Sequence, residues 1–106
     1  MTTDNQTRKQ FRAIGHKLSP VLIISNGLND NISAELERAL NDHELIKIRV
    51  NAADRDEKQT TLDAICTSHR AELIQLTGHI ALLYRAALKQ KRELSNLVRH
   101  AEVTKG

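Results

Sequence analysis

Aromatic residues are almost missing from this chain: Phe11 and Tyr84 are the only two among 106 residues, and there is no tryptophan. A binding surface that stacks bases on a row of exposed rings is therefore excluded. Cysteine is limited to Cys66, which excludes an internal disulfide framework and a cysteine-rich zinc site. Long apolar runs are missing too, and residues 1–17 are polar, so we expect no membrane partner and a cytoplasmic protein.

Signatures of catalysis are also lacking. The chain has no Walker loop, no G-x-G-x-x-G and no G-x-S-x-G motif. Its five histidines do not stand at the spacing of a metal-ligand pair with one another or with Cys66. Cys66 shares an apolar helical face with Leu62 and Ile65, which is typical of a core residue rather than a nucleophile. We expect no enzyme, no metal and no cofactor.

The composition is that of one folded domain, with 40% hydrophobic and 27% charged residues. The net charge of +3 is unevenly distributed: residues 1–17 carry +3, residues 18–83 carry −4 and residues 84–106 carry +4. If the fold brings the two basic ends together, they form one surface that attracts polyanions. Solvated termini are the equally weighted alternative.

Hydrophobic periodicity predicts alternating helices and strands. A short helix is expected over residues 7–16, a buried strand over 21–24, and a helix that Asn29 or Asp30 caps. Next we expect a strand over 45–50 and a helix bearing Leu62 and Ile65. Two more strands are expected over 72–77 and 79–85, with a turn or bulge at Gly78. The order αβαβαββ predicts an α/β fold, a small two-layer or sandwich-like domain with a mixed four-stranded sheet.

Alternation assigns the strand residues to faces. Lys47 and Arg49 are expected on one face of their strand, opposite Ile46, Ile48 and Val50. In the final hairpin we expect Ile74, Leu76, Ile80, Leu82 and Tyr84 on the helix-covered face. Gln75, Thr77 and Arg85 are expected beside Lys47 and Arg49, forming a basic face.

The turn Ser25-Asn26-Gly27 links a strand to a helix N-terminus. Small residues let a phosphate backbone approach closely and expose backbone N–H groups to it. An ordinary strand-to-helix turn is the commoner explanation of such a sequence.

Residues 86–106 form a basic tail with Leu88, Leu94 and Leu97 in a charged background. It is either an extra helix or a frayed end. We take residues 1–85 as the domain and 86–106 as the tail. If the tail is helical, its leucines support a second hypothesis for function: the protein is an interaction module that docks on a partner through a C-terminal helix.

Several blocks resemble the bacterial YhbY-type proteins, which are single CRM domains (chloroplast RNA splicing and ribosome maturation). Residues 16–21, HKLSPV, resemble that family's H-x-L-x-P-V, and Asn26-Gly27-Leu28 resembles its N-G-L loop. Residues 43–50, HELIKIRV, are close to its H-E-L-I-K-V-K-V, while Arg55 with Lys58 fits D-R-E-x-K. Residues 78–85, GHIALLYR, are similar to its closing hairpin. One departure is that Ile24 stands where the first glycine of the family's G-x-x-G loop would be.

The resemblance implies a fold similar to the C-terminal domain of translation initiation factor three and no catalytic activity. It also implies structured RNA as the partner, namely ribosomal RNA in precursors of the large (50S) subunit, without DNA specificity. Together with the charge pattern, it gives these candidate RNA-binding residues: Arg8, Lys9, Arg12, Lys17, Ser25, Asn26, Gly27, Lys47, Arg49 and Arg85.

Overall fold

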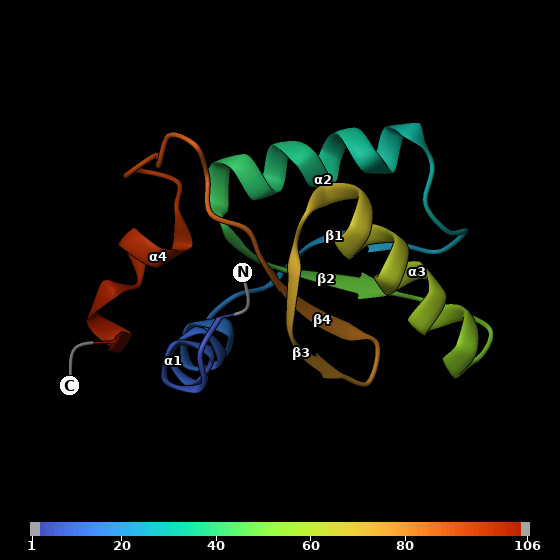
Figure 1. Cartoon of the computed structure of the whole chain (residues 1–106), viewed down its shortest axis with the longest axis horizontal. Coiled ribbons are helices and arrows are strands. Elements are labelled where there is room, and N and C mark those ends of the chain that lie inside the picture. Colours follow the sequence, from blue (N-terminus) through green and yellow to red (C-terminus); the bar gives the residue numbers. More distant parts are fainter. Residues whose placement is uncertain (1–2, 105–106) are drawn as a thin grey trace.

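The structure is a computed structural model that describes residues 3–104, and it is an α/β sandwich around one four-stranded sheet (Figure 1). The elements are α1 (Asn5–Gly15), β1 (Pro20–Ile24), α2 (Asp30–His43), β2 (Leu45–Val50), α3 (Arg55–His69), β3 (Glu72–Thr77), β4 (Ile80–Tyr84), α4 (Asn96–Arg99) and the 3₁₀ helix η1 (Ala101–Thr104). The predicted fold class and the order αβαβαββ are confirmed.

The sheet is mixed, with strand order β1-β2-β4-β3. β1 and β2 are parallel and are joined through α2, whereas β4 is antiparallel to both β2 and β3. The parallel pair ends with Ile24 beside Val50, so the loops that follow both strands emerge at the same edge of the sheet.

Side chains set the start of each long helix. Asn29 caps α2 by accepting a hydrogen bond from the Ile32 amide at 2.9 Å, which settles the choice between Asn29 and Asp30. Asp54 accepts from the Glu57 amide at 2.8 Å, and the Glu57 carboxylate accepts from the Ala53 amide at 3.0 Å. This reciprocal pair is of the capping-box type and fixes the start of α3.

The main core lies between the sheet and the helices α2 and α3. Leu36 and Leu40 of α2 and Leu62 and Ile65 of α3 are fully buried there. The strand residues that meet them are Ile24, Ile46, Ile48, Val50, Ala81 and Leu83. Cys66 packs at the margin of this cluster, and burial raises the pKa of its thiol, helped by the charges of Asp63 and Glu72. Its predicted place on the core face is therefore confirmed.

The opposite face of the sheet is partly covered by α1 and the C-terminal segment. Phe11 and Ile14 of α1 pack there on Leu45, Ile74 and Leu82, with Tyr84 and Leu97 at the margin of the cluster. This corrects the predicted hairpin faces. Because the β3 register shifts between Leu73 and Gln75, Ile74 falls on the α1 side with Leu82 and Tyr84, while Leu76 joins the main core.

A buried strand was predicted over residues 21–24, and this is wrong for two of those four residues. β1 lies at the edge of the sheet, and Val21 and Ile23 are 47% and 58% exposed. Leu22 and Ile24 point into the main core instead. The continuous apolar run VLII is therefore an edge strand with one open face.

Of the two alternatives for the C-terminal segment, helix or frayed end, its described part forms helix only in the short α4 and η1. Both elements contact α1, and Figure 1 shows α1 and α4 at the same end of the molecule. No helix among residues 3–104 is long and apolar enough to span a membrane.

Candidate nucleic-acid interface

The loop at Ser25, Asn26 and Gly27 leaves the carboxyl end of β1 and leads into α2. Ser25 and Asn26 are exposed. Gly27 has φ +78°, a left-handed conformation that glycine adopts without the strain a side chain would bring, and no atom lies within 4 Å of where its Cβ would be. The loop is therefore open to a ligand at its glycine.

Asn51 joins this loop to the predicted basic strand. The Arg49 guanidinium donates from Nε to Asn51 Oδ1 at 3.0 Å, and Asn51 Nδ2 donates to Ser25 Oγ at 3.5 Å. The Asn51 amide also donates to the carbonyl of Ile24 at 2.8 Å. Asn51 was absent from the sequence prediction. Its position one residue after β2, beside the end of a parallel strand, is the signal that identifies it.

Lys47 lies on the open part of the sheet, next to a shallow cavity of about 380 Å³. Gln75, Thr77 and the end of α1 at Gly15 and His16 also line this cavity, together with apolar atoms of Ile80 and Leu82. Lys47 and Arg49 pair with Leu82 and Ile80 of β4, which in turn pair with Gln75 and Thr77 of β3. The predicted grouping of Gln75 and Thr77 with the two cations is confirmed, and no carboxylate lines the described part of the cavity.

Helix α1, whose C-terminal end lines this cavity, carries further cations. Its Phe11, Ile14 and Gly15 are buried, while Lys9 and, just after the helix, Lys17 are exposed and Arg12 is half-buried. Within residues 3–104 these three cationic side chains form no ion pair. Their charge is therefore left for a ligand.

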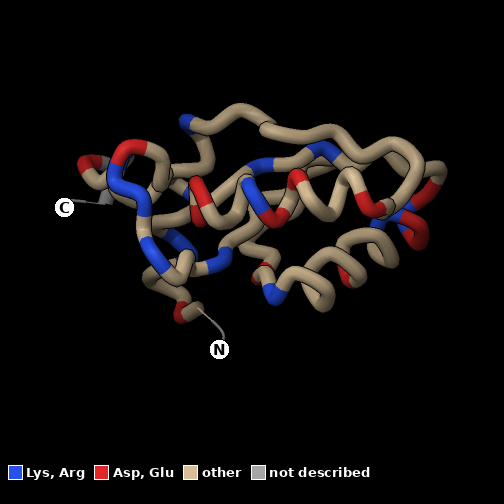
Figure 2. Tube along the Cα trace, turned by 90° about the horizontal axis from the view of Figure 1, so that it is seen from above, with Lys and Arg blue, Asp and Glu red and all other residues tan. Residues whose placement is uncertain are grey.

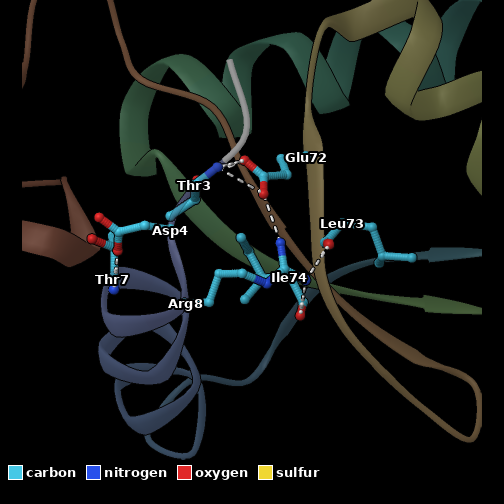
Figure 3. Close-up of polar contacts among 7 residues, drawn as sticks. All are labelled: Thr3, Asp4, Thr7, Arg8, Glu72, Leu73 and Ile74. Atoms are coloured by element: carbon cyan, nitrogen blue, oxygen red, sulfur yellow. Dashed lines mark hydrogen bonds and ion pairs between the residues drawn. The ribbon is translucent and has the colours of Figure 1, made fainter.

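Arg8 is different, although it belongs to the same helix. Its guanidinium donates to a Glu72 carboxylate oxygen at 2.6 Å and to the carbonyls of Leu73 and Ile74 at 3.1 and 2.9 Å (Figure 3). Burial raises the pKa of Glu72, but hydrogen bonds from Thr3 and the charge of Arg8 outweigh it, and the pKa lies below its ordinary value. Arg8 thus fastens α1 to β3.

Arg85 is not beside Lys47 and Arg49, which corrects its predicted position. It donates to Glu37 Oε1 at 2.8 Å, to Asn41 Oδ1 at 2.8 Å and to the carbonyl of His69 at 3.0 Å. These partners belong to the ends of α2 and α3, on the other side of the sheet. The reason is that Ala81 and Leu83 of β4 face the main core, so alternation puts Arg85 on that side, whereas Lys47 lies opposite Leu82 on the α1 side.

The two ends of the chain lie side by side, which is the condition that one shared basic surface requires. α1 contacts α4 and η1, and Figure 2 shows Lys and Arg positions of both ends on the left of the view. The candidate interface is defined here as Lys9, Arg12, Lys17, Lys47, Arg49, Asn51 and the loop Ser25–Gly27. Its chemistry is that of cations and exposed polar loop residues, which suits a polyanion.

Residues 4–85 match the CRS1 / YhbY (CRM) domain. The chain belongs to this family. The probable RNA-binding protein PA4753 of Pseudomonas aeruginosa is 47% identical over 104 residues, covering 97% of this chain and 100% of that protein. An RNA-binding protein of Haemophilus influenzae is 44% identical over 96 residues, covering 89% of this chain and 97% of that protein.

The CRM-domain assignment agrees with a solved structure. The solution structure of the hypothetical protein SAV1595 of Staphylococcus aureus, described as a candidate RNA-binding protein, superimposes with a TM-score of 0.73 at 28% identity. The match covers 90% of this chain and 98% of that one. The CRM match ends at residue 85, so the C-terminal segment lies beyond it. The division of the chain at that residue stays a prediction.

Proposed function

We propose that this CRM domain binds structured RNA non-catalytically through the candidate interface. The proposed RNA is ribosomal RNA in precursors of the large subunit, and the proposed role is assistance of their assembly in the cytoplasm. The observation that carries the proposal is the hydrogen-bonded connection from Arg49 through Asn51 to Ser25. It joins the cationic sheet face to the open glycine loop, so both elements act on one ligand.

The two aromatic rings support recognition through phosphates and shape. Phe11 and Tyr84 contact each other with ring centroids 4.7 Å apart, inside the cluster between α1 and the sheet. Since the chain has no other aromatic residue, base stacking has no platform, and lysine and arginine must supply most of the affinity. The names of the relatives support RNA as the ligand.

The test is co-sedimentation of the protein with ribosomal particles from its own cells at low and raised salt. We expect enrichment with large-subunit precursors that salt weakens, because each phosphate neutralised steepens the fall of log affinity with log salt by about 0.7–0.9. Lys47→Ala with Arg49→Ala should abolish the enrichment. Absence of the wild-type protein from all ribosomal fractions would overturn the proposal.

A matched double variant controls for net charge. Arg38→Ala with Arg70→Asn removes the same two charges from α2 and from the end of α3, and asparagine tolerates the left-handed backbone of Arg70, whose φ is +54°. This variant should keep its enrichment. Equal loss in both double variants would mean that net charge, rather than the candidate interface, directs the binding.

The alternative function, docking of a protein through a C-terminal helix, has less support. Leu97 packs against the cluster that holds Phe11 and Ile14, so it is not free for a partner, while Leu88 is exposed. Deletion of residues 86–106 would favour this alternative if it abolished an assembly while RNA affinity was negligible from the start.

A further inference from the structure

A second cavity lies between the α1–β1 connection, the end of α2 and the C-terminal segment. Its volume is about 280 Å³, and its lining includes Lys17, His43, Asn96, Arg99 and His100. Three of these five residues come from the segment beyond the CRM match. The cavity therefore exists only because that segment packs on the domain.

The cavity is cationic. The Lys17 and Arg99 side chains are exposed and have no hydrogen bond or ion pair within residues 3–104. His43 Nδ1 lies 2.7 Å from the carbonyl of Leu94, which only accepts, so Nδ1 carries the hydrogen, and Nε2 has no hydrogen bond among residues 3–104. Asn96 is buried and anchors the wall by donating to the carbonyl of Leu45 at 2.7 Å.

The carboxylates beside the histidines of the cavity lie outside its described lining. Asp42, next to His43, forms an ion pair with Lys91, and Glu102 lies 4.0 Å from His100 Nδ1. The group that fits such a lining is an anion with several acceptor oxygens, which is the chemistry of phosphate.

The position of Lys17 connects this cavity to the candidate interface. His16 lines the cavity beside Lys47, and the next residue, Lys17, lines the second cavity. A phosphate backbone that leaves the sheet face over this turn enters the second cavity directly. A single phosphate ion would occupy only one of the two cavities, whereas the backbone of one RNA strand is long enough to contact both.

We propose that the C-terminal segment supplies a second phosphate-binding site, which takes the RNA backbone after it crosses His16 and Lys17. Arg99 and Lys17 hold the phosphate oxygens, and His43 and His100 line the rest of the site. The inference rests on the proposed RNA binding and extends it to a segment that the CRM match does not include.

The test uses the full chain and ribosomal RNA purified from large subunits, with affinity measured by filter binding over a range of salt concentrations. Arg99→Ala should weaken binding several-fold and make the negative slope of log affinity against log salt shallower by about 0.7–0.9, the value for one lost phosphate contact. Arg92→Ala is the matched control, because Arg92 is an exposed cation of the same segment that does not line the cavity. It should leave the slope unchanged.

The outcomes separate the two proposals. If the wild-type chain does not bind this RNA, the proposed function itself fails. If the wild-type chain binds and Arg99→Ala keeps the wild-type salt slope, only the proposal of the second site is overturned. The same holds if Arg99→Ala and Arg92→Ala make the slope shallower by the same amount. Thermal unfolding serves as the control for folding: the Arg99→Ala variant should have the same unfolding midpoint temperature as the wild-type protein.

A second measurement distinguishes RNA from a free anion. Amide NMR signals of Lys17 and Arg99 should shift on addition of the RNA, and should shift little with inorganic phosphate at the same phosphate concentration. Equal shifts with inorganic phosphate, without displacement by RNA, would overturn the proposed path of the strand.

Discussion

The hydroxyl of Ser95, which is fully buried, donates a 2.7 Å hydrogen bond to the Glu44 carboxylate, which is itself 4% exposed. Glu44 sits between α2 and β2 with φ +62°, and it also accepts from the Ala87 amide at 2.8 Å and from Gln90 at 2.6 Å. One carboxylate thus attaches the C-terminal segment to the domain at three points. The proposed second phosphate-binding site depends on this attachment.

Ser95→Ala should destabilise the protein by about 1–3 kcal/mol, because it leaves a buried carboxylate oxygen without one of its donors. Urea unfolding measures the change. Ser68→Ala, an exposed serine at the end of α3, is the control and should alter the free energy of unfolding by less than about 0.5 kcal/mol. Equal stability of the two variants would contradict the role of Glu44 as an anchor.

The same carboxylate predicts a dependence on acid. Burial raises the pKa of Glu44, but hydrogen bonds from Ala87, Gln90 and Ser95 together lower it below the ordinary value of 4.5. A lowered pKa in the folded state stabilises the protein above the unfolded-state pKa, and this contribution is lost as the pH falls through the folded-state pKa. Glu44→Gln should therefore flatten the loss of stability below about pH 4.5, measured by urea unfolding at several pH values.

A matched carboxamide variant makes the pH experiment specific. Glu35 is an exposed carboxylate of α2 with no hydrogen bond in the described part of the chain. Glu35→Gln should keep the wild-type acid profile. If both variants gave that same profile, the hydrogen bonds of Glu44 would not be a source of the acid sensitivity.

The sequence predicted the order of elements and the cationic strand because both follow from local patterns. Alternation in residues 45–50 places Lys47 and Arg49 together whatever the rest of the fold does. The hairpin faces were wrong because alternation breaks between Leu73 and Gln75, and nothing in the local sequence marks that irregularity.

The partners of Arg8 and Arg85 could not be predicted from the sequence pattern. A basic residue on an amphipathic helix appears free until its partners are known, and the partner of Arg8, Glu72, is 64 residues away. Arg85 is engaged in the same way by Glu37. Asn51 was missed for the opposite reason, since its role depends on which strand lies beside β2.

Neighbouring cations of α1 should separate stability from binding. Arg8→Ala removes a guanidinium that contacts Glu72 and two carbonyls, so we expect a loss of about 1–3 kcal/mol in stability and little change in the salt slope of RNA affinity. Lys9→Ala should make that slope shallower and leave the free energy of unfolding unchanged. Thermal unfolding and filter binding on both variants check this. A shallower salt slope for Arg8→Ala would place Arg8 at the candidate RNA interface.

Arg85→Lys tests the contact between the ends of α2 and α3. The guanidinium binds Glu37, Asn41 and the carbonyl of His69 together, and an ammonium group lacks the planar geometry to do so. We expect a loss of about 1–2 kcal/mol in urea unfolding, since charge-assisted hydrogen bonds are removed while the charge remains. Arg38→Lys, an exposed arginine of α2, should change nothing. Wild-type stability of Arg85→Lys would show that charge alone suffices.

Two glycines with left-handed backbone conformations allow the loop to be tested against a matched control. Gly27 and Gly78 have φ +78° and +60°, and no atom lies within 4 Å of an added Cβ at either position. Alanine at each should therefore cost about 1–2 kcal/mol in stability, from the left-handed backbone alone. Only Gly27→Ala should also weaken RNA binding, because its methyl group occupies the space through which a phosphate backbone approaches the loop. Equal RNA affinity in the two variants, measured by filter binding at one salt concentration, would remove the loop from the interface and leave Lys47 and Arg49 as its centre.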